Sequence, residues 1–309
     1  MIKNLTILLL SLFAFKATAE TRIVYGEDNR LDLKNVHDEK VQKIGDAIAG
    51  RVFKYSYTES EDKSSVAFDR VLSLSHPRSM NVCKEERFAD QPTVADCTGF
   101  LVGENLLVTA GHCMVRMGQT VENDTSSACD SNSWMFDYKM DSKGSIDLKN
   151  VKADNIYNCK KVIYGKYEKD NDFALIELDR KVVGREPLKL NSKGTPNEGT
   201  EIFVMGHPTG LPLKYADGAK IFDINENYFT TNLDTFGGNS GSPVVNLETM
   251  EVEGILVRGD TDYYPHTTED GKKCMKVNSC DSQRENCIED DKNIKGEHVT
   301  VISKITDKL

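Results

Sequence analysis

Three features that often place a protein in a class are missing from this sequence. Basic residues are not in excess, because 39 Lys and Arg face 49 Asp and Glu, for a net charge of -10. Nucleic acids and anionic membranes favour basic surfaces, so we expect neither as the main partner. No stretch approaches the roughly 20 apolar residues of a membrane-spanning helix, so we expect no membrane insertion. Finally, no internal repeat or low-complexity tract stands out.

The chain begins as exported proteins do. Lys3 is followed by an apolar run from Leu5 through Phe15 and then by Ala17-Thr18-Ala19. A basic start, a short apolar segment and an A-x-A site are the parts of a secretory signal peptide. We therefore predict a signal peptide over residues 1–19 and a protein that is secreted or periplasmic.

All eight cysteines lie beyond this segment, and an even number in an oxidising compartment favours disulfides. The three C-terminal cysteines lack C-x-x-C spacing and a paired histidine, so we expect no metal and no cofactor. Cys97 and Cys113 flank a predicted hairpin, whose pairing would bring them together as a disulfide. Position alone makes Cys129 and Cys159 candidate partners. The pairing of these two and of Cys83, Cys274, Cys280 and Cys287 stays open.

Two regions follow the signal peptide. Residues 20–65 resemble an extended arm with a possible helix, given the spacing of Val41, Ile44 and Ile48. From residue 66 to 309, short β-rich segments alternate with turn residues, which indicates one main β domain. A polar, cysteine-containing insertion spans about 260–297, and a short helix is expected near the C-terminus.

Three side chains stand on predicted strand ends or tight turns. His112 ends the hairpin that starts at Cys97, and Asp172 directly precedes an apolar strand, which favours it over Asp170. Ser240 lies among glycines that permit a sharp bend and present its hydroxyl. Serine becomes a good nucleophile when an imidazole takes its proton and a carboxylate orients that imidazole. The three residues therefore predict a catalytic triad.

The order His, Asp, Ser argues against an α/β-hydrolase, which would run Ser, Asp, His and carry G-x-S-x-G. Here Ser242 stands at the second glycine of that motif. An esterase that uses the same triad remains an alternative, and so does a secreted protease-like binding protein without catalysis.

Thr109-Ala110-Gly111-His112-Cys113, Asp172-Phe173-Ala174-Leu175 and Gly238-Asn239-Ser240-Gly241-Ser242-Pro243 carry a resemblance to a known family. In these motifs the chain resembles the chymotrypsin-like serine endopeptidases, nearest the bacterial glutamyl-endopeptidase-like branch. The resemblance implies an all-β fold of two packed six-stranded antiparallel barrels with a short C-terminal helix. It also implies an oxyanion hole from the N–H groups of Gly238 and Ser240, protein or peptide substrates, and a monomer.

The same resemblance bears on substrate preference. Asp234, followed by Thr235, lies where trypsins hold the carboxylate that binds Lys or Arg, so we expect these two residues in the substrate pocket and a basic P1 residue. Glutamate recognition in the glutamyl branch partly uses a histidine, which Ile255-Leu256-Val257 lacks. A Glu-specific endopeptidase is the alternative.

Arg22-Ile23 resembles the activation site of trypsin-type zymogens, so a short propeptide could end at Arg22. Trypsins pair the new amino group with an aspartate directly before the serine. That position is Asn239, which lacks the charge, so the trypsin activation switch does not transfer intact.

Overall fold

The computed structural model describes residues 24–125, 128–192, 194–259, 261–288 and 296–309. The predicted signal peptide and the cut after Arg22 lie outside these residues. Within the described ranges, no helix combines the length and apolar character needed to cross a membrane.

Six antiparallel strands close into a first barrel. In hydrogen-bonded order they are β10 (Asn132–Phe136), β2 (Ile48–Phe53), β7 (Cys97–Leu101), β8 (Leu106–Thr109), β13 (Asn171–Leu178) and β12 (Ile156–Glu168). The barrel closes because β12 pairs with β10, and β9 (Gln119–Asp124) adds one more strand to β12. His112 follows β8, and Asp172 lies at the start of β13, so neighbouring strands carry both residues.

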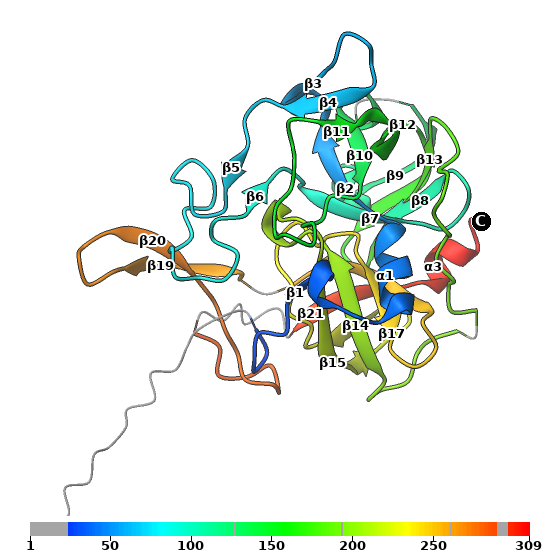
Figure 1. Cartoon of the computed structure of the whole chain (residues 1–309). Helices are drawn as coiled ribbons and strands as arrows, with labels where there is room; N and C mark the ends of the chain where they lie inside the picture. The colour runs from blue at the N-terminus through cyan, green and yellow to red at the C-terminus, as the bar shows by residue number, and fades with distance from the viewer. Residues whose placement is uncertain (1–23, 126–127, 193, 260, 289–295) are drawn as a thin grey trace, which may run out of the picture.

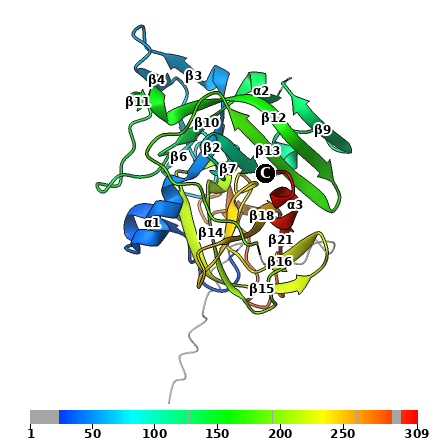
Figure 2. The ribbon, with the colours of Figure 1, turned by 90° about the vertical axis from the view of Figure 1, so that its right-hand side faces the viewer.

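A second barrel of six antiparallel strands packs against the first (Figure 2). Its order is β15 (Lys214–Ile224), β14 (Glu201–Gly206), β17 (Pro243–Asn246), β18 (Val252–Arg258), β21 (Glu297–Val301) and β16 (Tyr228–Thr231). Pairing of β16 with β15 closes it, and β1 (Leu31–Asp32) extends β15. The all-β, two-barrel fold expected from the sequence is confirmed.

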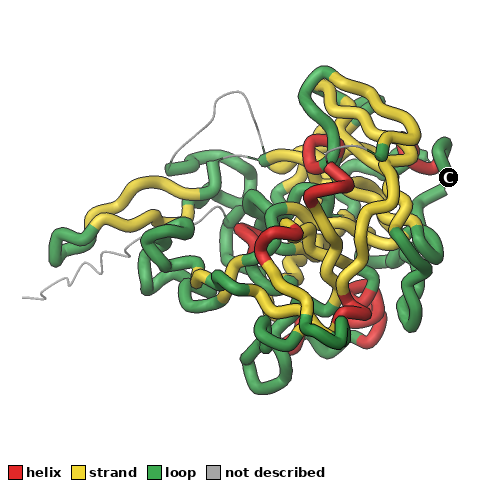
Figure 3. Tube along the Cα trace, turned by 90° about the horizontal axis from the view of Figure 1, so that it is seen from above, coloured by secondary structure: helices red, strands yellow, loops and turns green. Residues whose placement is uncertain are grey.

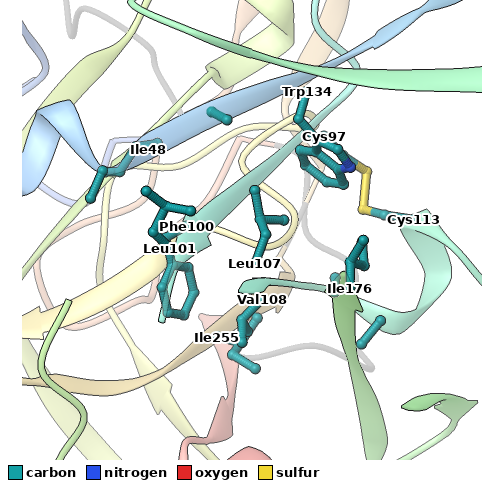
Figure 4. Packing of buried hydrophobic residues seen from close by; sticks show 14 of the residues in the cluster. Ile48, Cys97, Phe100, Leu101, Leu107, Val108, Cys113, Trp134, Ile176 and Ile255 are labelled. Atoms are coloured by element: carbon teal, nitrogen blue, oxygen red, sulfur yellow. A yellow bond between two sulfur atoms is a disulfide. The ribbon is translucent and has the colours of Figure 1, made fainter. Parts of the chain in front are cut away.

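Apolar side chains from both barrels meet in one large core cluster, and the second barrel has a further cluster of its own. Leu107 and Trp134 are buried in the first barrel, and Ile255 of β18 belongs to the same cluster (Figure 4). Burying this much apolar surface is the main favourable term in folding. The shared core fixes the two barrels relative to each other, and the segments that carry Ser240 and His112 lie at this junction.

The expected N-terminal helix is present as α1 (Glu39–Asp46), where Asp38 caps the helix by accepting hydrogen bonds from Lys40 N and Val41 N. Ile48 differs from the expectation, because it begins strand β2 and not another helical turn. Since β2 pairs with both β7 and β10, the barrel region starts well before residue 66. Gly50 and Arg51 interrupt the apolar character of this strand, which concealed it in the sequence.

Smaller elements surround the barrels. A three-stranded sheet combines β3 (Tyr57–Glu59), β4 (Ser65–Phe68) and β11 (Val151–Lys152), and β5 (Leu72–Ser73) pairs with β6 (Pro92–Thr93). The hairpin of β19 (Tyr263–Thr267) and β20 (Lys273–Val277) projects from the body of the molecule (Figures 1 and 3). The helical segments are α2 (Ala128–Ser131), α3 (Ser303–Thr306), η1 (Leu33–Asn35), η2 (Lys54–Ser56), η3 (Gly111–Cys113), η4 (Ala153–Asn155) and η5 (Pro208–Gly210).

All eight cysteines are paired. The four disulfides are Cys83–Cys274, Cys97–Cys113, Cys129–Cys159 and Cys280–Cys287. The first ties the segment before β6 to β20, across 191 residues of sequence. The insertion expected at 260–297 therefore consists, in its described part, of an anchored hairpin and a small disulfide loop. Glu297 is not part of it, because it begins barrel strand β21.

Candidate active site

His112 is held on a short turn that allows almost no movement. Residue 111 must be glycine, because a Cβ there would overlap Lys166 O and lie 2.8 Å from Phe173 N. The next residue, His112, donates its backbone N–H to Asp172 Oδ1 at 2.9 Å, and its ring Nδ1 lies 2.8 Å from Asp172 Oδ2. One carboxylate thus orients both the backbone and the ring of the histidine.

Asp172 is buried, whereas the His112 side chain is 26% exposed. An Nδ1–H donated to a carboxylate leaves Nε2 as the proton acceptor of the imidazole. Within the described residues, Nε2 has no hydrogen-bond partner. The second barrel helps to position this pair, because Thr300 Oγ1 donates to Asp172 O at 3.2 Å. Within the described residues, His112 is bonded to Asp172 and makes no hydrogen bond or ion pair with Asp170, so the sequence choice between the two aspartates agrees with this geometry.

Ser240 belongs to the second barrel but lies against the first. Its carbonyl oxygen accepts from Thr98 N at 2.8 Å and lies 3.7 Å from Cys113 Sγ. Gly241 has φ +91°, and a Cβ on it would overlap Thr98 O and lie 2.9 Å from Ala110 N. The serine is thereby placed beside the turn that carries His112. The structure contains no hydrogen bond between the two side chains, and such contacts are often long before substrate binds.

A hydroxyl from the first barrel fixes the loop before Ser240. Thr98 Oγ1 donates to Gly238 O at 2.8 Å and accepts from His207 N at 3.1 Å. Gly238 has φ +94°, which favours glycine, and a Cβ on it would lie 2.5 Å from His207 O. In the described part of the chain, the N–H groups of Gly238 and Ser240 have no acceptor. Both remain available to bind a negatively charged oxygen.

His207 supports this loop from the core. Burial lowers the pKa of its imidazole to about 3, so the ring stays neutral, stacked on Tyr138. Among the described residues, the nearest approach to a metal site is Cys97, Cys113 and His112. Both sulfur atoms are in one disulfide and cannot act as thiolate ligands.

A cleft of about 270 Å³ opens beside Ser240. It is lined by Thr235, Phe236, Gly237, Ser240, Leu256, Val257, Arg258, Gly259, Asp262 and Glu297. Glu297 supplies a carboxylate to the lining of this cleft. Its side chain is 3% exposed and accepts hydrogen bonds from Thr235 Oγ1 and, at 3.3 Å, from Tyr25 OH. A Cβ on Gly259 would overlap the Glu297 carboxylate, so this carboxylate lies directly against the cleft wall.

Asp262 adds a second carboxylate, which accepts from Gly237 N at 2.7 Å. The guanidinium of Arg258 is bonded to Lys169 O. Two acidic side chains therefore line the cleft, and the one arginine in its lining is bonded to a backbone carbonyl of the first barrel.

Asp234, expected in the substrate pocket, does not line this cleft, whereas Thr235 does. The Asp234 carboxylate is buried and accepts from Tyr25 N and Asn29 N, both at 2.9 Å. It therefore holds the N-terminal segment and is not open to a substrate. The expected place of Asp234 in the substrate pocket is corrected for this reason: both oxygens of its carboxylate are bonded to backbone N–H groups of the N-terminal segment.

The region that contains the His112, Asp172 and Ser240 motifs also matches a family model. Residues 97–255, just over half of the chain, match the trypsin-like peptidase domain family. The chain belongs to the trypsin-like peptidase family. This peptidase is thus a serine endopeptidase, as the resemblance implied. A comparison with curated protein sequences finds no match.

Solved structures similar to this peptidase include several proteases. The active form of the Rv3671c protease from M. tuberculosis is 13% identical, with 98% of this chain and 93% of that chain covered and a TM-score of 0.45. The VesB protease of Vibrio cholerae is 15% identical, with 90% of this chain and 65% of that chain covered and a TM-score of 0.47. A Glu endopeptidase is 19% identical, with 82% of this chain and 93% of that chain covered and a TM-score of 0.39.

Sequence reasoning about this peptidase missed Glu297 and Asp262, because both fell within the expected insertion. A signal for Glu297 was present: it begins the strand that ends at Val301, as Asp172 lies at the start of its own strand. Such an acidic residue at the start of a barrel strand is a candidate for lining the active-site cleft, even outside a recognised motif.

The burial of Asp234 predicts a pH-dependent stability. Burial raises the pKa of the Asp234 carboxyl to about 7. The N–H donors of Asn29 and Tyr25 act in the opposite direction and lower this pKa, as does the charge of Arg30, whereas the charge of Asp28 raises it. The folded carboxyl therefore binds a proton more tightly than the unfolded one. Its stabilising contribution is fully present below the unfolded pKa of about 4 and is lost as the pH rises through about 7.

Asp234→Asn removes this titration. Between pH 4 and pH 8, the free energy of unfolding of the wild type should fall relative to that of the variant by a few kcal/mol. Urea unfolding at each pH measures this difference. A difference that stays constant over this range, or one that grows in favour of the wild type as the pH rises, would contradict the prediction.

Proposed function

We propose that this endopeptidase cleaves peptide bonds with His112, Asp172 and Ser240 as its triad. His112 Nε2 accepts the Ser240 proton while Ser240 Oγ attacks the scissile carbonyl carbon. The resulting oxyanion is bound by the N–H groups of Gly238 and Ser240, a type of donor whose loss costs roughly 10²–10³ in rate.

Collapse of the tetrahedral intermediate breaks the C–N bond. The imidazolium of His112 gives its proton to the leaving amine, and the acyl group remains as an ester on Ser240. Water then attacks the ester, with His112 again accepting a proton and returning it to Ser240. The single observation that carries this proposal is the paired contact of Asp172 with the backbone and the ring of His112.

Ser240→Ala tests the proposed chemistry. The variant should lose cleavage of casein by a factor of at least about 10³ and should not react with a serine-directed phosphonate, which labels the wild type. Ser242→Ala is the matched control, two residues along the same loop, because its buried hydroxyl has no hydrogen-bond partner in the described structure.

Equal cleavage by wild type and Ser240→Ala would reject Ser240 as the nucleophile. No cleavage of any protein or peptide by the folded wild type would favour the protease-like binding protein. Hydrolysis of activated esters without cleavage of peptides would favour the esterase.

We propose that the substrate residue at P1 is Lys or Arg. Asp234 does not line the cleft and so does not explain a preference for a basic P1 residue. Glu297 supports this preference instead, with Asp262 as the second acidic group of the cleft. A buried carboxylate attracts a cationic side chain strongly because water screens the pair poorly. The same carboxylate repels a glutamate, which argues against the Glu-specific alternative.

Glu297→Gln keeps the size of the side chain and removes its charge. We expect kcat/KM for Lys and Arg peptides to fall by roughly 10–100-fold, with peptides that have a neutral P1 residue little affected. Glu253→Gln is the matched control, since Glu253 is a buried glutamate of the same barrel bonded to Asn191 and Asn246. A P1 library in which Glu is preferred would overturn the proposal.

Export is also proposed, with a signal peptide over residues 1–19. Four disulfides are compatible with an oxidising compartment. N-terminal sequencing of the protein recovered outside the cytoplasm should begin at Glu20 or, after a further cut, at Ile23. A sequence that begins at Met1 would contradict both.

A further inference from the structure

Residues Val24–Arg30, here called the arm, lie against the second barrel behind the cleft. Gly26 N donates to Cys280 O at 3.2 Å, and Cys280 N donates to Val24 O at 3.2 Å. The side chains of Val24, Tyr25 and Arg30 are buried. The arm is therefore bonded to the disulfide loop of the insertion, and its buried side chains pack it into the body of the molecule.

Asp234 binds two points of the arm, because its two carboxylate oxygens accept from Tyr25 N and Asn29 N. Arg30 adds a contact with the cleft wall itself: its guanidinium lies 4.2 Å from the ring centroid of Phe236. The backbone that forms one wall of the cleft, residues 234–237, is thus held from behind by the arm.

Tyr25 reaches past this wall to the charged group of the cleft. Its hydroxyl donates to Glu297 Oε1 at 3.3 Å, while Thr235 Oγ1 donates to Oε2. Each oxygen of Glu297 therefore has its own donor, one from the arm and one from the cleft wall. Two donors restrict the rotation of a carboxylate, and a restricted carboxylate loses less entropy when it binds a cation.

We propose that Tyr25 is a specificity-determining positioning residue, which holds Glu297 in the orientation that receives a basic P1 side chain. The proposal rests on the function proposed above for Glu297. It makes the arm part of the substrate pocket, although the arm precedes the barrels in sequence and Tyr25 does not line the cleft.

Tyr25→Phe tests this role, because it keeps the packed ring and removes only the hydroxyl. For a peptide with P1 Lys, KM should rise roughly tenfold with kcat changed by less than about twofold. For the matching peptide with P1 Leu, neither constant should change. Tyr215→Phe is the matched control, a buried tyrosine whose hydroxyl bonds to Asp217 on β15 and not to a cleft residue.

The double variant Tyr25→Phe/Glu297→Gln separates this proposal from the one on which it rests. The quantity compared is the Lys-over-Leu ratio, that is, kcat/KM for the P1 Lys peptide divided by kcat/KM for the P1 Leu peptide. If Tyr25 acts through Glu297, the double variant should have the same Lys-over-Leu ratio as Glu297→Gln alone. If Glu297→Gln leaves the ratio unchanged, the function proposed for Glu297 fails. If Glu297→Gln lowers the ratio and Tyr25→Phe does not, only the role of Tyr25 is overturned.

A stability loss in Tyr25→Phe greater than that in Tyr215→Phe calls for a second variant. Asp234→Asn loosens the arm at Tyr25 N and Asn29 N while leaving both hydroxyl donors to Glu297 in the chain. Its Lys-over-Leu ratio should fall in the same direction, through KM. An unchanged ratio in that variant overturns the proposal.

Discussion

The close approach of Gly241 to the first barrel is the constraint on which the site depends. A Cβ at this position would overlap Thr98 O, so only glycine lets the two barrels meet here. Because Ser240 precedes this glycine, the contact brings a residue of the second barrel beside the turn that carries His112. The position of Ser240 relative to His112 and Asp172 therefore depends on a backbone contact between the barrels, and the three side chains do not create that contact.

Much of the fold could be predicted because its signals are local. Short apolar segments between turn residues indicated strands, and the alternation continued through most of the chain. His112 and Asp172 were found in the same way, since each stands directly at the end of a strand that can be recognised in the sequence. Their contact follows from the pairing of β8 with β13, which places the two strand ends at one edge of the sheet.

Features that depend on distant segments could not be predicted. Asp234 has the sequence position of a pocket residue, but its carboxylate is turned toward backbone N–H groups more than 200 residues away, at separations of 209 and 205. No local pattern reports such a contact. The strand β2 was missed because Gly50 and Arg51 interrupt its apolar character, and the bond of Cys83 to Cys274 depends on how two projecting loops meet.

The hydrogen bond between Tyr25 and Glu297 joins residues that are 272 positions apart. The first partner is among the earliest described residues, and the second lies on the last barrel strand. Contacts of such long range form late, because the chain must first close a very large loop. The ribosome adds Glu297 272 residues after Tyr25, so this side of the cleft can form only after that long stretch of chain has been made.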